Sequence, residues 1–213
     1  MTEQELASMI WDVKETIRDT YSDAEVEDVI LPFTLLRRMD CILLPVRNEI
    51  EAELAKYPDE KTKEVVLKSL MRKHKLQFYN TSGFTMSSLL AKPAAIGPNF
   101  KLYLEGYTDN IKDIMNNFTH EDAENGDLTK IYSRLLRENL LYQVTQQFAN
   151  IDLSPEQVDN AKMGTIFETI PPSAESGWKE EGSTSLNMQI VMQVKMIMKN
   201  QVYMISPRKL IEL

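Results

Sequence analysis

The sequence predicts a mainly α-helical fold, a multi-helix orthogonal bundle, with a loop and a segment of ambiguous strand or helix character near the C-terminus. Apolar residues recur at helical spacing along most of the chain, and helix-start patterns such as Ser22 and Glu25 precede several of these stretches. The chain has 213 residues, of which 43% are hydrophobic and 26% charged, so it can bury a sizeable core.

The first third of the chain predicts four helices. Thr2 and Glu5 form a capping-box pattern before an apolar stripe at i, i+3, i+4, i+7 and i+11, made of Leu6, Met9, Ile10, Val13 and Ile17. A second helix follows Ser22, and Pro32 should kink it or begin a new helix. Residues 46–57 and 60–74 predict two further helices, which Pro58 separates.

The middle of the chain predicts short helices joined by polar loops. Residues 78–86 are rich in Gly, Asn, Ser and Thr and predict a loop. Short helical patterns follow around residues 89–90, across 96–107, across 111–118 with Asp109 as cap, and over 128–137 and 139–149. Residues 120–127 form an acidic loop between them.

The C-terminal part changes character. Ser154-Pro155-Glu156-Gln157 combines an N-cap, a Pro at the first helical position and a capping-box Gln, which predicts a helix from 155 to about 170. Residues 171–185 are linker-like, and 186–213 form a Met-rich segment whose alternation fits a strand and whose spacing also fits a helix. We therefore expect one helical domain over residues 1–170, followed by this linker and segment.

Charge is unevenly distributed along the chain. The formal net charge is −8, yet residues 61–104 carry eight Lys or Arg and one acid, Glu64. A local basic surface can bind a polyanion even on an acidic protein. The candidate DNA-binding residues are four bases and the two polar residues that follow them, namely Lys68, Arg72, Lys73, Lys75, Tyr79 and Asn80. The alternatives are a solvated helix face for the bases and packing of the helix end for the aromatics.

Several classes of function lack a basis in the sequence. No run of 18 apolar residues suggests a membrane span, and Cys41 is alone, so we expect a cytoplasmic protein without an internal disulfide. His74 and His120 lack partners at ligand spacing, so no metal site is expected. No motif for a complete active site is present, and we name no catalytic residue.

The apolar run LPFTLLRRMDCILLP over residues 31–45 contains three charges. On a helical wheel, Arg37 and Arg38 fall opposite the face that holds Leu36 and Met39. Asp40 follows Arg37 at i+3 and can pair with it. We therefore expect the two arginines on an outward face that contacts another domain, a subunit or DNA.

Three stretches, VILPFTLLRRMDCILLP, QFYNTSGFT and NLLYQVTQQFANIDLSPEQVDNAKMGTIFE, resemble in order and spacing the modification (M) subunit of type I restriction–modification systems over about residues 6–170. The resemblance implies the N-terminal helical domain of an enzyme that methylates adenine N6 in DNA with S-adenosylmethionine. It also implies partners: DNA, a specificity (S) subunit, a second M subunit, and restriction (R) subunits that can join. The helical domain would help to close around DNA and hold the assembly.

The catalytic motifs of that family are missing here. Neither a glycine-rich cofactor motif nor Asn-Pro-Pro-Phe/Tyr occurs, so these residues alone should bind no cofactor and transfer no methyl group. After Glu168 the sequence departs from the family pattern, which suggests an insertion, a truncation or an altered reading frame. Ser206 and Pro207 resemble part of a motif that borders the cofactor site. A stand-alone helical interaction module and a small DNA-binding regulator remain alternative functions.

Overall fold

A computed structural model of the protein describes residues 3–116, 128–159 and 162–163. Within these residues the fold is mainly α, as predicted, and β-structure is limited to one isolated bridge between Asn80 and Tyr107. The elements in chain order are α1 (Glu3–Ile17), α2 (Asp23–Leu54), α3 (Glu60–Lys73), α4 (Met86–Leu89), the 3₁₀ helix η1 (Pro93–Ala95), α5 (Ile96–Glu105), α6 (Asp109–Asn116), α7 (Leu128–Arg137) and α8 (Leu141–Ala149).

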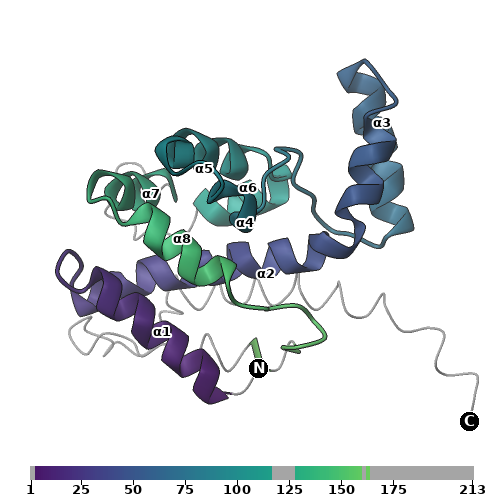
Figure 1. The fold of residues 1–213 in the computed structure, drawn as a ribbon. Coiled ribbons are helices and arrows are strands. Elements are labelled where there is room, and N and C mark those ends of the chain that lie inside the picture. Colours follow the sequence, from purple (N-terminus) through teal and green to yellow (C-terminus); the bar gives the residue numbers. More distant parts are fainter. Residues whose placement is uncertain (1–2, 117–127, 160–161, 164–213) are drawn as a thin grey trace, which may run out of the picture.

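Helix α2 is the central element, and α1, α7 and α8 pack against it (Figure 1). Three phenylalanines from α2, α5 and α8 form the centre of the core, because the Phe33 ring centroid lies 5.5 Å from those of both Phe100 and Phe148. All three are fully buried. Aromatic pairs at this spacing add to the stabilisation that burial alone provides.

Helix α2 continues for 32 residues through both Pro32 and Pro45, so no new helix begins at Pro32, and the helix expected over residues 46–57 is the last part of α2. Its start is as predicted, since the Glu25 carboxylate accepts hydrogen bonds from the backbone N–H and the hydroxyl of Ser22. A proline inside a helix costs about 3 kcal/mol. Burial offsets this cost at Pro32, because every residue from 29 to 41 on α2 is buried.

A buried polar network joins α2, α5 and the loop before α4. The Asp40 carboxylate accepts hydrogen bonds from the backbone N–H of Met86 at 2.6 Å and from the hydroxyl of Tyr103 at 3.1 Å. The Tyr103 hydroxyl also lies 2.7 Å from that of Tyr107. Asn80 donates to the Tyr103 carbonyl at 2.9 Å, which fixes the loop against α5.

Gly106 is required where this loop meets the end of α5. A Cβ atom built on Gly106 would lie 2.5 Å from Asn80 Oδ1 and 2.7 Å from the backbone nitrogen of Ser82. The backbone torsion φ is −72°, so the reason for glycine is space and not an unusual conformation.

The helices expected around residues 89–90, 96–107, 111–118, 128–137 and 139–149 are present as α4 to α8. The helix expected from 155 is wrong at its start, because residues 155–157 form a turn. Instead, Asp159 Oδ1 accepts from the backbone N–H of Lys162, and Lys162 and Met163 are helical. The Thr2 cap, the 120–127 loop and everything predicted for 171–213 lie outside the described residues.

Candidate functional site: a projecting basic helix

Helix α3 projects from the rest of the domain together with the last turns of α2 (Figure 1). Its first turn is capped by Asp59, whose Oδ1 accepts from the backbone N–H of Thr62 at 2.8 Å. Its end is closed by Lys75 in the left-handed region at φ 58°, with the Leu76 N–H bonded to the Met71 carbonyl at 2.7 Å. No residue of α3 is fully buried, so most of its surface faces solvent.

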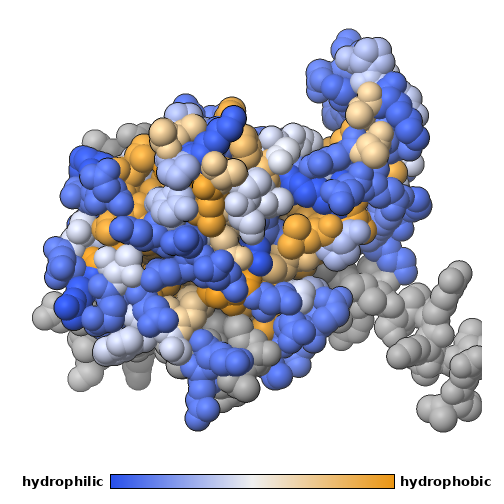
Figure 2. Space-filling view, in the orientation of Figure 1, coloured by the Kyte–Doolittle hydropathy of each residue, from blue (hydrophilic) through white to orange (hydrophobic). Residues whose placement is uncertain are grey.

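One face of α3 is a basic stripe, defined here as Lys61, Val65, Lys68 and Arg72. These residues follow one another at i, i+4, i+7 and i+11, so they lie on one side of the helix over about 16 Å. All four are exposed, and Val65 is 68% exposed. Figure 2 shows hydrophilic side chains over most of the visible surface of this projection.

The other predicted basic residues have different surroundings. Lys73 Nζ lies 2.5 Å from Glu49 on α2, and His74 Nε2 lies 3.2 Å from the same carboxylate. The hydrogen bond from Lys73 lowers the pKa of Glu49. Lys75 is half-buried at the end of the helix. Of the predicted DNA-binding bases, Lys68 and Arg72 therefore share the stripe, and Lys61 joins them although sequence reasoning did not select it.

Tyr79 and Asn80 lie in the interior of the domain. Tyr79 is 1% exposed and Asn80 is fully buried. Besides its bond to Tyr103, Asn80 accepts from the backbone N–H of Ser82 at 2.9 Å. Both residues therefore shape the loop, and in this conformation neither side chain is available to stack on a base. The packing alternative considered for the aromatics is confirmed.

Arg37 and Arg38 do not face outward, and that expectation is wrong. Arg37 is 8% exposed and its Nε donates to the Ile151 carbonyl at 2.6 Å. Arg38 is 1% exposed, and its Nη1 donates to the carbonyls of Leu153 and Val158. The segment after α8 folds back over the polar face of α2, so this side of the helix is covered by the chain itself.

Asp40 lies in the core and bonds Tyr103 and Met86, not Arg37 as the i+3 spacing suggested. Burial raises the pKa of Asp40, and the Arg47 and Arg37 charges act in the opposite direction. Burial lowers the pKa of the Arg38 guanidinium to about 10, which leaves it charged at neutral pH. Burial also raises the pKa of the Cys41 thiol.

Within the described part of the chain, no three His, Cys, Asp or Glu residues are grouped to hold a metal ion. No helix there is both long enough and apolar enough to cross a membrane. His120, Ser206 and Pro207 are outside the described residues, so their predicted roles stay predictions.

The chain matches one family model, which is described as the HsdM N-terminal domain, over residues 6–148. No curated protein matches the chain significantly, and neither does any solved structure. The match runs from within α1 to the last turn of α8, including the projecting helix and the buried arginine pair, and it ends just before the segment that these arginines bind.

Proposed function

This chain belongs to the HsdM N-terminal domain family, which forms the N-terminal part of the modification subunit in type I restriction–modification systems, and we propose a function on this basis. The proposed function is to contact DNA and to take part in subunit assembly. The enzyme it serves would transfer a methyl group from S-adenosylmethionine to adenine N6 in DNA. The partners proposed for it are DNA, a specificity subunit and a second modification subunit, with restriction subunits able to join.

The basic stripe of α3 is the observation that carries the DNA-binding proposal. It places three cations on one exposed side of a projecting helix, where each can neutralise a phosphate without rearrangement of the core. Glu64 pairs with Lys68 at 2.6 Å, but both side chains are more than 60% exposed, so this pair is weak and phosphate can replace the carboxylate. Lys61 and Arg72 flank this pair along the helix.

The contacts expected of such a stripe are to the DNA backbone and not to bases. Lysines on flexible stems act as point charges towards phosphate, and such contacts carry position but no sequence information. Recognition of the target sequence would then belong to the specificity subunit, and cofactor chemistry to a catalytic domain with the motifs that these 213 residues lack.

Binding of the full chain to a random-sequence 30-base-pair duplex, measured by fluorescence anisotropy across a salt series, tests the proposal. The triple variant Lys61→Ala, Lys68→Ala, Arg72→Ala should bind more weakly at every salt concentration. The slope of log K against log salt is negative, and each lost phosphate contact reduces its magnitude by about 0.9, so the magnitude should fall by about 2 to 3.

The matched control removes three exposed bases that lie elsewhere, through Lys92→Ala, Lys101→Ala and Arg137→Ala. It changes the net charge by the same amount but should leave the slope within about 0.5 of the wild type. Equal losses in both triple variants would mean that net charge alone drives binding. An unchanged slope in the α3 variant would make the stripe an ordinary solvated face.

A further inference from the structure

Described residues cover one face of α2 along only part of its length. This face, called the Arg37 face here, consists of the residues in line with Arg37 along the helix and at its C-cap, namely Arg37, Cys41, Leu44, Asn48, Ala52 and Ala55. Arg37 and Cys41 are 8% and 4% exposed, because residues 151–158 lie over them. Leu44 is 48% exposed, and the three residues of the face beyond it are exposed as well. The uncovered part, from Leu44 to Ala55, is about 16 Å long.

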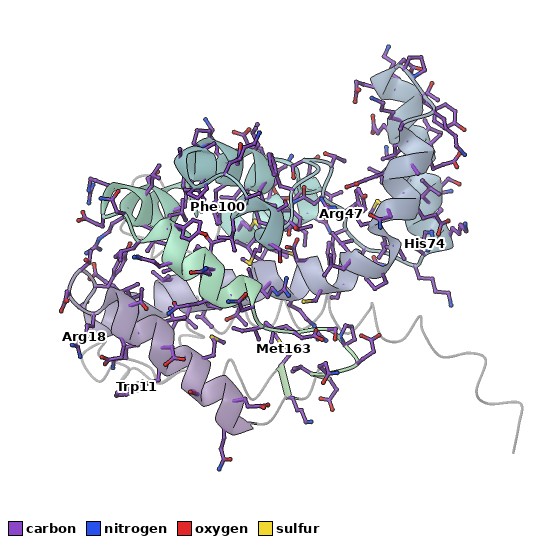
Figure 3. The ribbon with its side chains drawn as sticks, viewed as in Figure 1. Trp11, Arg18, Arg47, His74, Phe100 and Met163 are labelled. Atoms are coloured by element: carbon purple, nitrogen blue, oxygen red, sulfur yellow. The ribbon has the colours of Figure 1, made fainter. Side chains whose placement is uncertain are left out.

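The described segment after α8 ends with the start of a helix. Asp159 caps this helix, since its Oδ1 accepts from the backbone N–H of Lys162 at 2.8 Å and its carbonyl accepts from the N–H of Met163 at 2.9 Å. Met163 is 2% exposed and belongs to the hydrophobic core, whereas Lys162 is exposed. Figure 3 shows Met163 below α2, on the side away from α5. The helix therefore starts with one side against the domain and the other in solvent.

The sequence after Met163 continues the buried side of this helix. Four apolar residues at i, i+3, i+4 and i+7 predict a stripe on one side of a helix, namely Met163, Ile166, Phe167 and Ile170. Pro171 follows the last of them and would end the helix. From Asp159 to Ile170 such a helix would be about 16 Å long, which is the length of the uncovered part of the Arg37 face. A helix this short is marginal alone in water, so it needs a surface on which to pack its apolar stripe.

We propose that residues 160–170 of this chain form a helix that docks on the uncovered part of the Arg37 face, with Ile166 and Phe167 over Leu44. The occupant is this chain itself, because Met163 is already buried and only three residues separate it from Ile166. The direction follows from the burial along α2. Every residue from 29 to 41 is buried, so the surface open to the helix runs from Leu44 towards the end of α2.

This docking would bring the chain that follows Pro171 to the end of α2, at the base of the projecting α3. A domain that followed would then begin beside the basic stripe, and its position relative to the proposed DNA contact would be set by the docked helix. The docking does not depend on DNA binding by the stripe, so either proposal can fail alone.

A photo-crosslinker in the full chain tests the contact directly. With p-benzoylphenylalanine in place of Leu44, irradiation should give a crosslink within one chain to a peptide that contains Ile166 and Phe167, identified by mass spectrometry. Leu102 is the matched position, because it is 51% exposed on α5, and the same crosslinker there should give no such product. A crosslink from position 44 to a second chain, or none to residues 163–170, would overturn the proposal.

A thermal unfolding series gives a second test. Leu44 and Leu102 are about equally exposed among the described residues, so Leu44→Asp and Leu102→Asp should have equal effects if nothing covers Leu44. With a docked helix, Leu44→Asp should lower the midpoint of unfolding by about 4–8 °C and Leu102→Asp by less than about 2 °C.

Variants on the helix itself complete the series. Phe167→Asp places a charge on the apolar stripe and should lower the midpoint as Leu44→Asp does, whereas Thr165→Asp, on the opposite side of the predicted helix, should change it by less than about 2 °C. Combining Leu44→Asp with Phe167→Asp should add little to either loss, because both break the same contact. Equal midpoints for Leu44→Asp and Leu102→Asp, or fully additive losses in the double variant, would contradict the docked helix.

Discussion

Replacement of Arg38 by methionine should destabilise the domain more than any change on its solvent-facing helices. Methionine keeps an unbranched apolar stem of similar length and removes the guanidinium group, so the change acts mainly on hydrogen bonding. Arg38 is 1% exposed and donates from Nη1 to the carbonyls of Leu153 and Val158. Both carbonyls belong to the segment that covers the polar face of α2.

The size of the expected loss of stability in Arg38→Met follows from the two carbonyl groups that lose their hydrogen-bond donor. A hydrogen bond to a charged group contributes about 1.5–3 kcal/mol, so two would give about 3–6 kcal/mol if the segment stayed in place. The segment can instead detach, which exposes the buried Leu153 and Val158 at about 1.5–3 kcal/mol each. Loss of the buried cation also removes its desolvation cost. We therefore expect a net loss of about 2–4 kcal/mol.

Urea denaturation followed by circular dichroism measures this loss, and hydrogen exchange at the Val158 amide shows whether the segment detaches first. Arg37→Met is the comparison, because Arg37 has one such bond, from Nε to the Ile151 carbonyl. Its loss should be about half as large. A change below about 0.5 kcal/mol in Arg38→Met, with unchanged exchange at Val158, would refute the reasoning.

Two further predictions concern the other buried polar groups. Tyr79→Phe should leave the free energy of unfolding unchanged or raise it, because the Tyr79 hydroxyl has no partner among the described residues. Tyr103→Phe should lower the free energy of unfolding by about 1–3 kcal/mol, because Asp40 and Tyr107 lose a hydrogen-bond partner. Equal effects of the two variants in urea denaturation would contradict this difference. Because the pKa of Asp40 is raised in the folded state, the folded protein keeps this carboxyl protonated at pH values above the ordinary pKa of 3.8. The contribution of Asp40 to stability therefore falls as the pH rises from 3.8 to the folded-state pKa. The stability of the wild type relative to Asp40→Asn should therefore fall over that interval, and a constant difference between pH 3 and 8 would contradict it.

The sequence predicted most of the helices because their signals are local. Apolar spacing and capping patterns place α5, α7 and α8, and Ser22 and Glu25 start α2 as expected. The continuity of α2 past Pro32 was not predictable, because the cost of a proline in a helix is local and the burial that offsets it at Pro32 comes from distant elements. The same holds for the turn at 155–157, which is tied to Arg38 through the Val158 carbonyl.

The candidate site was only partly predictable for the same reason. Helical spacing in the sequence could have separated Lys61, Lys68 and Arg72 from Lys73, because a stripe at i, i+4, i+7 and i+11 is a local pattern. No local signal distinguishes an arginine that faces a partner from one that meets its own chain more than 110 residues later, as Arg37 and Arg38 do.

The arginine pair of α2 also connects the helical domain to residues beyond the family match. The family match ends at residue 148, but Arg37 and Arg38 take their acceptors from Ile151, Leu153 and Val158. A protein that ended at the limit of the match would lack these three acceptors and the buried side chains of Leu153 and Val158, which cover the polar face of α2. We therefore expect a stable version of this domain to extend at least to Val158, ten residues beyond the end of the family match.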